Sequence, residues 1–131
     1  MDQGPLVTQQ IDAGSRFIHE FAKQIPIQAA FWLRTSEDNE WFLYVVSDQI
    51  NDSSVRLAYG EVSRITSKLA DPWLDSVHVK VIGTNKPVAK AILDIQGKYP
   101  GRLPARYRDL QLGGIFVEEA YVYPPPAAVP N

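Results

Sequence analysis

The stretch from Ile27 to Asp48 constrains the fold of this chain most strongly, because two apolar runs flank a short polar cluster within it. The runs 27–33 and 41–46 are rich in aromatic and β-branched residues, which pack well on a pleated sheet. The polar residues 36–39 between them suit a four-residue turn. We therefore predict that this stretch forms a β-hairpin.

A four-residue turn sets the register of this hairpin, because residues at equal distances from the turn then face each other. Phe31 faces Tyr44 on one side, and Arg34 faces Trp41 on the other. The guanidinium of Arg34 is expected to lie over the indole of Trp41, where it contacts the ring while its charged head stays hydrated. Both faces of the hairpin are apolar. The rest of the chain must therefore cover both faces, or one face is offered to a partner.

Periodicity outside the hairpin predicts three helices and two further strands. Apolar residues at helical spacing mark the helices, and alternation of apolar and polar residues marks the strands. Trp73 and Leu74 follow a proline that stops a helix, and they are expected to fold back onto the core. The helices are predicted at about 8–25, 55–70 and 85–97, and the strands at 76–82 and 115–123.

The resulting order is helix, strand, strand, helix, strand, helix, strand. It predicts an α+β fold, with a single domain over residues 1–123, a four-stranded mixed sheet that includes the N-terminal hairpin, and three packed helices. Residues 1–7 are expected to be a loose lead-in, and residues 124–131 a proline-rich tail outside the core. Residues 98–113 lack a sustained period and contain two prolines and two glycines, so a long loop is expected there.

Composition excludes several classes of function. With 13 basic and 15 acidic side chains the net charge is -2, so no overall field draws the chain to nucleic acid or to an anionic membrane. The absence of cysteine removes disulfides, thiolate chemistry and zinc sites that need sulfur. The sequence shows no secretion-type leader and no apolar run approaching about 18 residues, which predicts a cytoplasmic protein without membrane contact.

The segment 98–109 gathers four cations and two tyrosines, and we predict that it is the main binding surface. Arginine beside tyrosine suits contacts with phosphates and bases, and it is also common at protein interfaces. A solvated loop whose tyrosines lie down on the domain is the other interpretation. The residues of this predicted site are Lys98, Tyr99, Arg102, Arg106, Tyr107 and Arg108.

Two pairs of polar residues on the later strands form a second candidate site. His78 and Lys80 share one face of the strand 76–82, where they could hold a phosphate or carboxylate or simply face solvent. Glu118 and Glu119 are adjacent in the last strand, so alternation is expected to send one carboxylate to each face. The inward carboxylate could act as an acid or base or hold a divalent metal. The competing interpretation is an edge strand with an inward charge, or a bulge, that blocks aggregation.

The glutamates and Lys80 invite comparison with nucleases of the PD-(D/E)xK type, which combine a hairpin, a following strand and flanking helices. Such enzymes carry an acidic residue two positions before the lysine, where this chain has His78. The sequence contains two histidines and lacks Gly-x-Ser-x-Gly, a Gly-rich phosphate loop and His-Glu-x-x-His. It therefore predicts no catalytic residues, no metal-ligand set and no cofactor.

Several motifs are spread along the chain: AAFWL at 29–33, WFL at 41–43, a helix around Tyr59 and Ile65, LGG at 112–114, and AYVYP at 120–124. In these motifs the chain resembles a set of small bacterial proteins of unknown function. The resemblance implies a bacterial cytoplasmic setting and a similar fold. It implies no activity and no site residues.

The sequence favours a non-catalytic α+β module that binds another protein chain or itself, with a symmetric homodimer as the expected assembly. The apolar hairpin and the absence of a catalytic set support this interpretation. One alternative is a nucleic-acid-associated protein that uses the basic segment 98–109. Another is a metal-dependent, nuclease-like enzyme built on Glu118 or Glu119 with Lys80.

Overall fold

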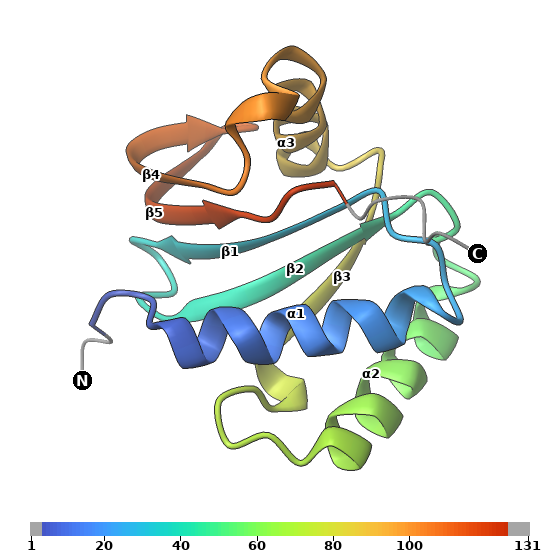
Figure 1. Cartoon of the computed structure of the whole chain (residues 1–131). Coiled ribbons are helices and arrows are strands. Elements are labelled where there is room, and N and C mark those ends of the chain that lie inside the picture. The colour runs from blue at the N-terminus through green and yellow to red at the C-terminus, as the bar shows by residue number, and fades with distance from the viewer. Residues whose placement is uncertain (1–3, 126–131) are drawn as a thin grey trace.

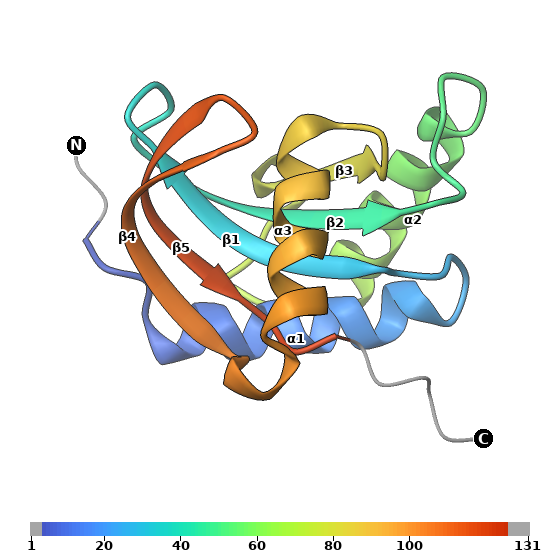
Figure 2. The same cartoon turned by 90° about the horizontal axis from the view of Figure 1, so that it is seen from above.

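The computed structural model describes residues 4–125, and this part of the chain folds into three layers. Helices α1 (Thr8–Ala22) and α2 (Val55–Leu69) cover one face of a mixed sheet, and α3 (Pro87–Lys98) covers the other (Figure 1). Figure 2 shows α3 crossing the strands on its face. The strands lie in the order β3-β2-β1-β5-β4. Their bounds are β1 Ala29–Thr35, β2 Trp41–Ser47, β3 Val79–Gly83, β4 Ala105–Leu112 and β5 Ile115–Val122.

The hairpin formed by β1 and β2 has the predicted register. Phe31 pairs with Tyr44, and their rings stack with centroids 5.3 Å apart. Arg34 pairs with Trp41, and its guanidinium carbon lies 5.6 Å from the centre of the indole. Both predictions are confirmed, because turn length and strand alternation are local properties that the sequence displays directly.

Helices of the chain itself cover both faces of the hairpin. Trp32 and Leu43 pack under α1 and α2, whereas Phe31 and Val46 pack under α3. These four side chains are at most 1% exposed. The hairpin therefore needs no partner to bury its apolar faces, and it does not offer an uncovered face for binding.

The two edge strands of the sheet, β3 and β4, are treated differently. The amide of Val81 in β3 donates a hydrogen bond to the hydroxyl of Tyr59 on α2, at 3.0 Å. This contact satisfies a backbone donor that would otherwise be open to another strand. On β4, Arg106, Arg108 and Asp109 are exposed, and charges of this kind discourage edge-to-edge pairing.

The fold class, the mixed sheet and the three helices are confirmed, but the sheet has five strands and not four. The predicted loop 98–113 contains β4, which pairs with β5 along most of its length. Tyr107 and Leu110 both pack on the α3 side although they are three residues apart, and Asp109 between them has a φ of 51°. This irregularity broke the alternation that would have marked a strand.

The lead-in and the third strand also differ from expectation. Leu6 is buried at 2% exposure, and its carbonyl accepts a hydrogen bond from Arg106 at 3.1 Å, so residues 4–7 are anchored and not loose. The strand predicted at 76–82 begins only at Val79, after a 3₁₀ turn over Ser76–His78 that leaves Val77 73% exposed. Residues 126–131 of the predicted tail lie outside the described residues. No helix within residues 4–125 is long and apolar enough to cross a membrane.

Candidate functional site

The predicted basic site is divided between two places, and the first lies at the end of α3. Lys98 pairs with Asp94 of the same helix, at 3.1 Å between Nζ and Oδ2. Tyr99 follows the helix, and Arg102 in the short turn Pro100–Arg102 places its guanidinium 4.9 Å from the centre of the Tyr99 ring. This group lies beyond the sheet, on the side that α3 covers.

The second group belongs to β4, where neighbouring side chains point to opposite faces. Tyr107 packs on the α3 side. Arg106 pairs with Tyr121 on the α1 side, where it lies over the Tyr121 ring and donates to the Leu6 carbonyl. Arg108 lies across from Glu119 of β5 and is exposed. The six predicted residues therefore do not form one continuous surface.

Glu118 and Glu119 both lie beside Arg34 of β1. The Nη2 of Arg34 is 2.8 Å from Oε1 of Glu119, and its Nε is 3.6 Å from Oε1 of Glu118. The expectation of one carboxylate on each face is wrong, because the register shifts at Arg34 and Thr35 and makes a bulge in β5. The register shift fits the bulge of the competing interpretation. The alternative of an edge strand is wrong, since β5 lies between β1 and β4.

His78 and Lys80 come together around the ring of Phe42. The His78 and Phe42 ring centroids are 5.4 Å apart, and the Lys80 ammonium is 4.4 Å from the Phe42 centroid. Acidic residues of the turn between β1 and β2 pair with both, Glu40 with His78 at 3.3 Å and Asp38 with Lys80 at 3.5 Å.

Lys80 and the two glutamates do not share a site. Lys80 lies over Tyr44 on the α3 side of the sheet. Glu118 and Glu119 pair with Arg34 on the opposite side, which faces α1. Strands β2 and β1 also separate β3 from β5. In the described part of the chain, no group of three His, Cys, Asp or Glu side chains could hold a metal ion.

A hollow of about 620 Å³ opens between the start of α1 and the connection from α2 to β3. Trp32 and Trp41 lie at its base and are 1% and 2% exposed. Trp73 also lines it but is 47% exposed, which differs from the expectation that Trp73 folds back onto the core. Most of the lining is apolar, with Pro5, Val7, Trp32, Trp41, Pro72 and Leu74, and its titratable members are Asp75 and His78.

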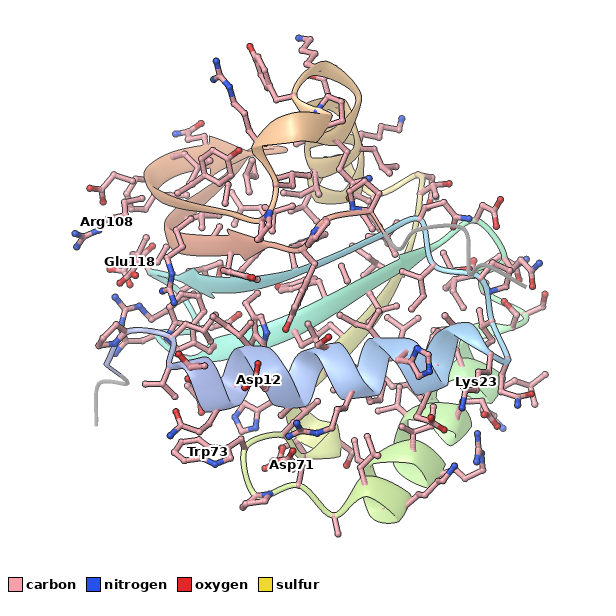
Figure 3. The ribbon with its side chains drawn as sticks, viewed as in Figure 1. Asp12, Lys23, Asp71, Trp73, Arg108 and Glu118 are labelled. Atoms are coloured by element: carbon pink, nitrogen blue, oxygen red, sulfur yellow. The ribbon has the colours of Figure 1, made fainter. Side chains whose placement is uncertain are left out.

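A second hollow, of about 410 Å³, lies on the other side of Trp73. Asp12 and Arg16 of α1 line it together with Asp71 and Pro72, so that Trp73 stands between two depressions. Figure 3 shows Asp12, Asp71 and Trp73 gathered where α1 meets the segment that follows α2. We call Trp73 and the two hollows that it separates the Trp73 surface.

The backbone around Trp73 is held firmly by its neighbours. Ala70 ends α2 in a left-handed conformation with a φ of 47°, and Leu74 is buried at 6% exposure. The carboxylate of Asp71 accepts a hydrogen bond from the Trp73 amide at 2.9 Å and pairs with Arg16. The Arg16 guanidinium, with help from that amide, lowers the pKa of Asp71. These contacts tie the exposed indole to α1.

The sequence interpretation missed the Trp73 surface, although Asp71-Pro72-Trp73 marked a break between a helix and a strand. The exposure of a single tryptophan after a proline depends on which neighbours cover it. Those neighbours, the segment 4–7 and α1, are distant in sequence. No local pattern reports this proximity.

His78 links the hollow to the turn of the hairpin. Burial alone would lower its pKa, but hydrogen bonds with Asp75 at 2.7 Å and Glu40 at 3.3 Å outweigh burial and raise the pKa of His78. The protonated ring is therefore stabilised by the two carboxylates. Lys80 and Asp38 are the neighbouring charged pair, and the Lys80 ammonium also contacts the ring of Phe42.

We expect this raised pKa to make stability depend on pH. The contribution of protonated His78 is complete below the usual histidine pKa of about 6.5 and is lost as the pH rises through the higher folded value. Urea unfolding of the parent and of His78→Gln should show a stability difference that shrinks by about 0.2 to 1 kcal/mol between about pH 5.5 and about pH 8.5. Glu40→Gln should reduce this pH dependence, and a difference that stays constant with pH would refute the link.

Comparison with family models, curated proteins and solved structures finds no match for this chain, so the resemblance drawn from the hairpin and last-strand motifs stays a prediction.

Proposed function

We propose that this protein is a non-catalytic module that binds another polypeptide through the Trp73 surface. The observation that carries the proposal is the 47% exposure of Trp73 between two hollows, in a chain whose other two tryptophans are buried. Tryptophan is enriched among the residues that dominate binding energy, because its large rigid side chain loses little entropy when a partner buries it.

The anchoring of Trp73 supports a binding role. Asp71 holds the Trp73 amide and contacts Arg16, and Leu74 is inserted into the core. A partner would thus meet a surface that is already ordered, and binding would not require the connection between α2 and β3 to fold. Preorganisation of this kind leaves more of the contact energy for affinity.

The other candidate functions receive less support. The cations expected to contact nucleic acid occur in two groups, and Lys98 and Arg106 are engaged within the chain. The residues compared with a nuclease, Lys80 and the pair Glu118 and Glu119, lie on opposite faces of the sheet. Self-association remains one form of the proposal, in which the bound polypeptide is a second copy of this chain.

The proposal is tested by selecting a displayed random-peptide library on the immobilised chain and measuring the affinity of the recovered peptides. We expect Trp73→Ala to weaken their binding at least about tenfold, which corresponds to about 1.4 kcal/mol. The variant should keep most of its stability, because the indole is half exposed. Leu57→Ala is the matched control, since Leu57 is 76% exposed on α2 and lies outside both hollows.

Two results would contradict the proposal: no peptide is recovered although the chain sediments as a monomer, or the recovered peptides bind Trp73→Ala as tightly as the parent. Sedimentation of the parent and of Trp73→Ala at tens of micromolar tests whether the bound polypeptide is a second copy of this chain. A dimer that the substitution dissociates would show that the Trp73 surface is used for self-association.

A further inference from the structure

We infer that the polypeptide taken by the Trp73 surface is a proline-rich segment that carries a basic side chain. This inference rests on the proposed function and adds the chemical class of the partner. Two observations lead to it. One is the alternation of hollow, indole and hollow, and the other is the surplus of carboxylates around them.

The shape of the surface suits an extended proline-rich helix. A polyproline II segment has three residues per turn and rises about 3.1 Å per residue, so its successive ridges repeat roughly every 9 Å. Such segments dock into grooves lined by aromatic side chains. Here Trp73 and Pro72 line both depressions, and the exposed ring of Pro5 adds apolar surface to the first. An extended segment that lies across Trp73 and Pro72 can therefore contact both hollows.

The chemistry of the surface also favours this occupant over a helix or strand. Polyproline II has no internal hydrogen bonds and is already extended before binding, so it pays little entropy on docking. Neither hollow includes a residue of the edge strands β3 or β4. A partner that adds a strand to the sheet would therefore have no edge strand to pair with at this surface.

The charges at the Trp73 surface favour a partner segment that carries a basic side chain. The second hollow is lined by the carboxylates of Asp12 and Asp71 and by one cation, Arg16, which pairs with Asp71. Asp12 is exposed and has no ion pair or hydrogen bond within residues 4–125. In the first hollow the Asp75 side chain is 65% exposed and pairs with His78, which also pairs with Glu40. A lysine or arginine of the partner thus has Asp12 as its acceptor.

The tail of the chain itself is a useful contrast to this partner. Residues 123–131, YPPPAAVPN, supply prolines but no lysine or arginine. Docking of a tail from a second copy would use the apolar hollows alone. The inference therefore predicts that a peptide of these residues binds more weakly than a proline-rich peptide that ends in arginine.

The same random-peptide selection tests the partner class. We expect the recovered sequences to be enriched in paired prolines within one turn of a lysine or arginine. Binding of a recovered peptide should shift the NMR resonance of the Trp73 indole N–H, which is assigned by its disappearance in Trp73→Phe. Replacing the basic residue of that peptide by alanine should weaken binding about twofold to fivefold, and added salt should reduce this difference.

A matched pair of variants tests the role of Asp12. Asp12→Asn should weaken binding of the basic peptide about twofold to fivefold and leave its alanine version unaffected. Asp52→Asn is the control, because Asp52 is an exposed carboxylate in the loop before α2 and lines neither hollow. Equal effects of the two variants would overturn the assignment of Asp12.

Failure of this inference can be told apart from failure of the proposed function. Recovered peptides that shift the Trp73 resonance but lack prolines or basic residues would overturn the inference and leave the binding function in place. A tail peptide of residues 123–131 that binds as tightly as the basic peptides would also overturn it, in favour of a second copy. If no peptide shifts the Trp73 resonance, both proposals fall.

Discussion

Gly113→Ala is expected to lower the free energy of unfolding by about 2 to 4 kcal/mol, measured by urea unfolding. Gly113 has a φ of 58°, a left-handed conformation that costs an alanine roughly 1 kcal/mol or more. A Cβ at this position would lie 2.3 Å from the carbonyl carbon of Pro87 and 2.5 Å from the amide nitrogen of Val88. Both are backbone atoms of the first turn of α3, so the turn between β4 and β5 would have to move away from the helix.

Gly114→Ala is the control for this experiment. Gly114 also has a positive φ, 85°, but no atom lies within 4 Å of the position that its Cβ would take. Backbone strain alone should therefore lower the free energy of unfolding of Gly114→Ala, by roughly 1 to 2 kcal/mol. The difference between the two variants measures the close packing of the turn on α3. Equal losses would show that this contact is not limiting.

Gly14→Ala is expected to destabilise the fold by about 1 to 3 kcal/mol, although alanine is the better helix former. Gly14 lies in the middle of α1, where an added Cβ would be 2.3 Å from the Tyr123 hydroxyl and 3.0 Å from the Trp32 indole nitrogen. That nitrogen donates to the Tyr123 hydroxyl at 2.9 Å, and the hydroxyl donates to the Ile11 carbonyl at 2.7 Å. Burial raises the pKa of Tyr123, so the hydroxyl stays protonated.

The clash in Gly14→Ala would thus separate groups that are buried and hydrogen-bonded, and leaving such groups unpaired costs about 1 to 3 kcal/mol. Gly60→Ala in α2 is the matched control, because nothing lies within 4 Å of its Cβ position. That variant should gain about 0.5 to 1 kcal/mol from helix propensity alone. Thermal or urea unfolding should therefore give changes of opposite sign, and stabilisation by both would refute the close approach of α1 to the sheet.

The hairpin illustrates how much of the fold could be predicted from local pattern. The two apolar runs 27–33 and 41–46 and a four-residue turn are sufficient to place Phe31 against Tyr44 and Arg34 over Trp41. The three helices followed in the same way from their apolar periodicity. These features depend on residues that are close together in sequence, and the length of the turn specifies the register of the hairpin.

The last two strands show where local pattern fails. Strand β5 has an extra residue at Glu118 and Glu119, and Asp109 lies opposite in β4 with a positive φ. These two irregularities shift the alternation by one position in both strands. In the sequence this shift is visible only as a loss of periodicity, so the segment that forms β4 is predicted to be a loop. The bulge also brings both glutamates to Arg34, a residue of β1. Only the pairing of β5 with its two neighbours defines this arrangement.

The sequence alone determined the class of the fold, the hairpin with its register, and the absence of cysteine chemistry, because each depends on composition or on neighbours along the chain. Tertiary structure alone decided which side chains form a surface. It covered both faces of the hairpin, divided the basic residues between two places, and left Trp73 exposed beside Asp12. The physical reason is that burial and charge pairing depend on elements distant in sequence, which no local period encodes.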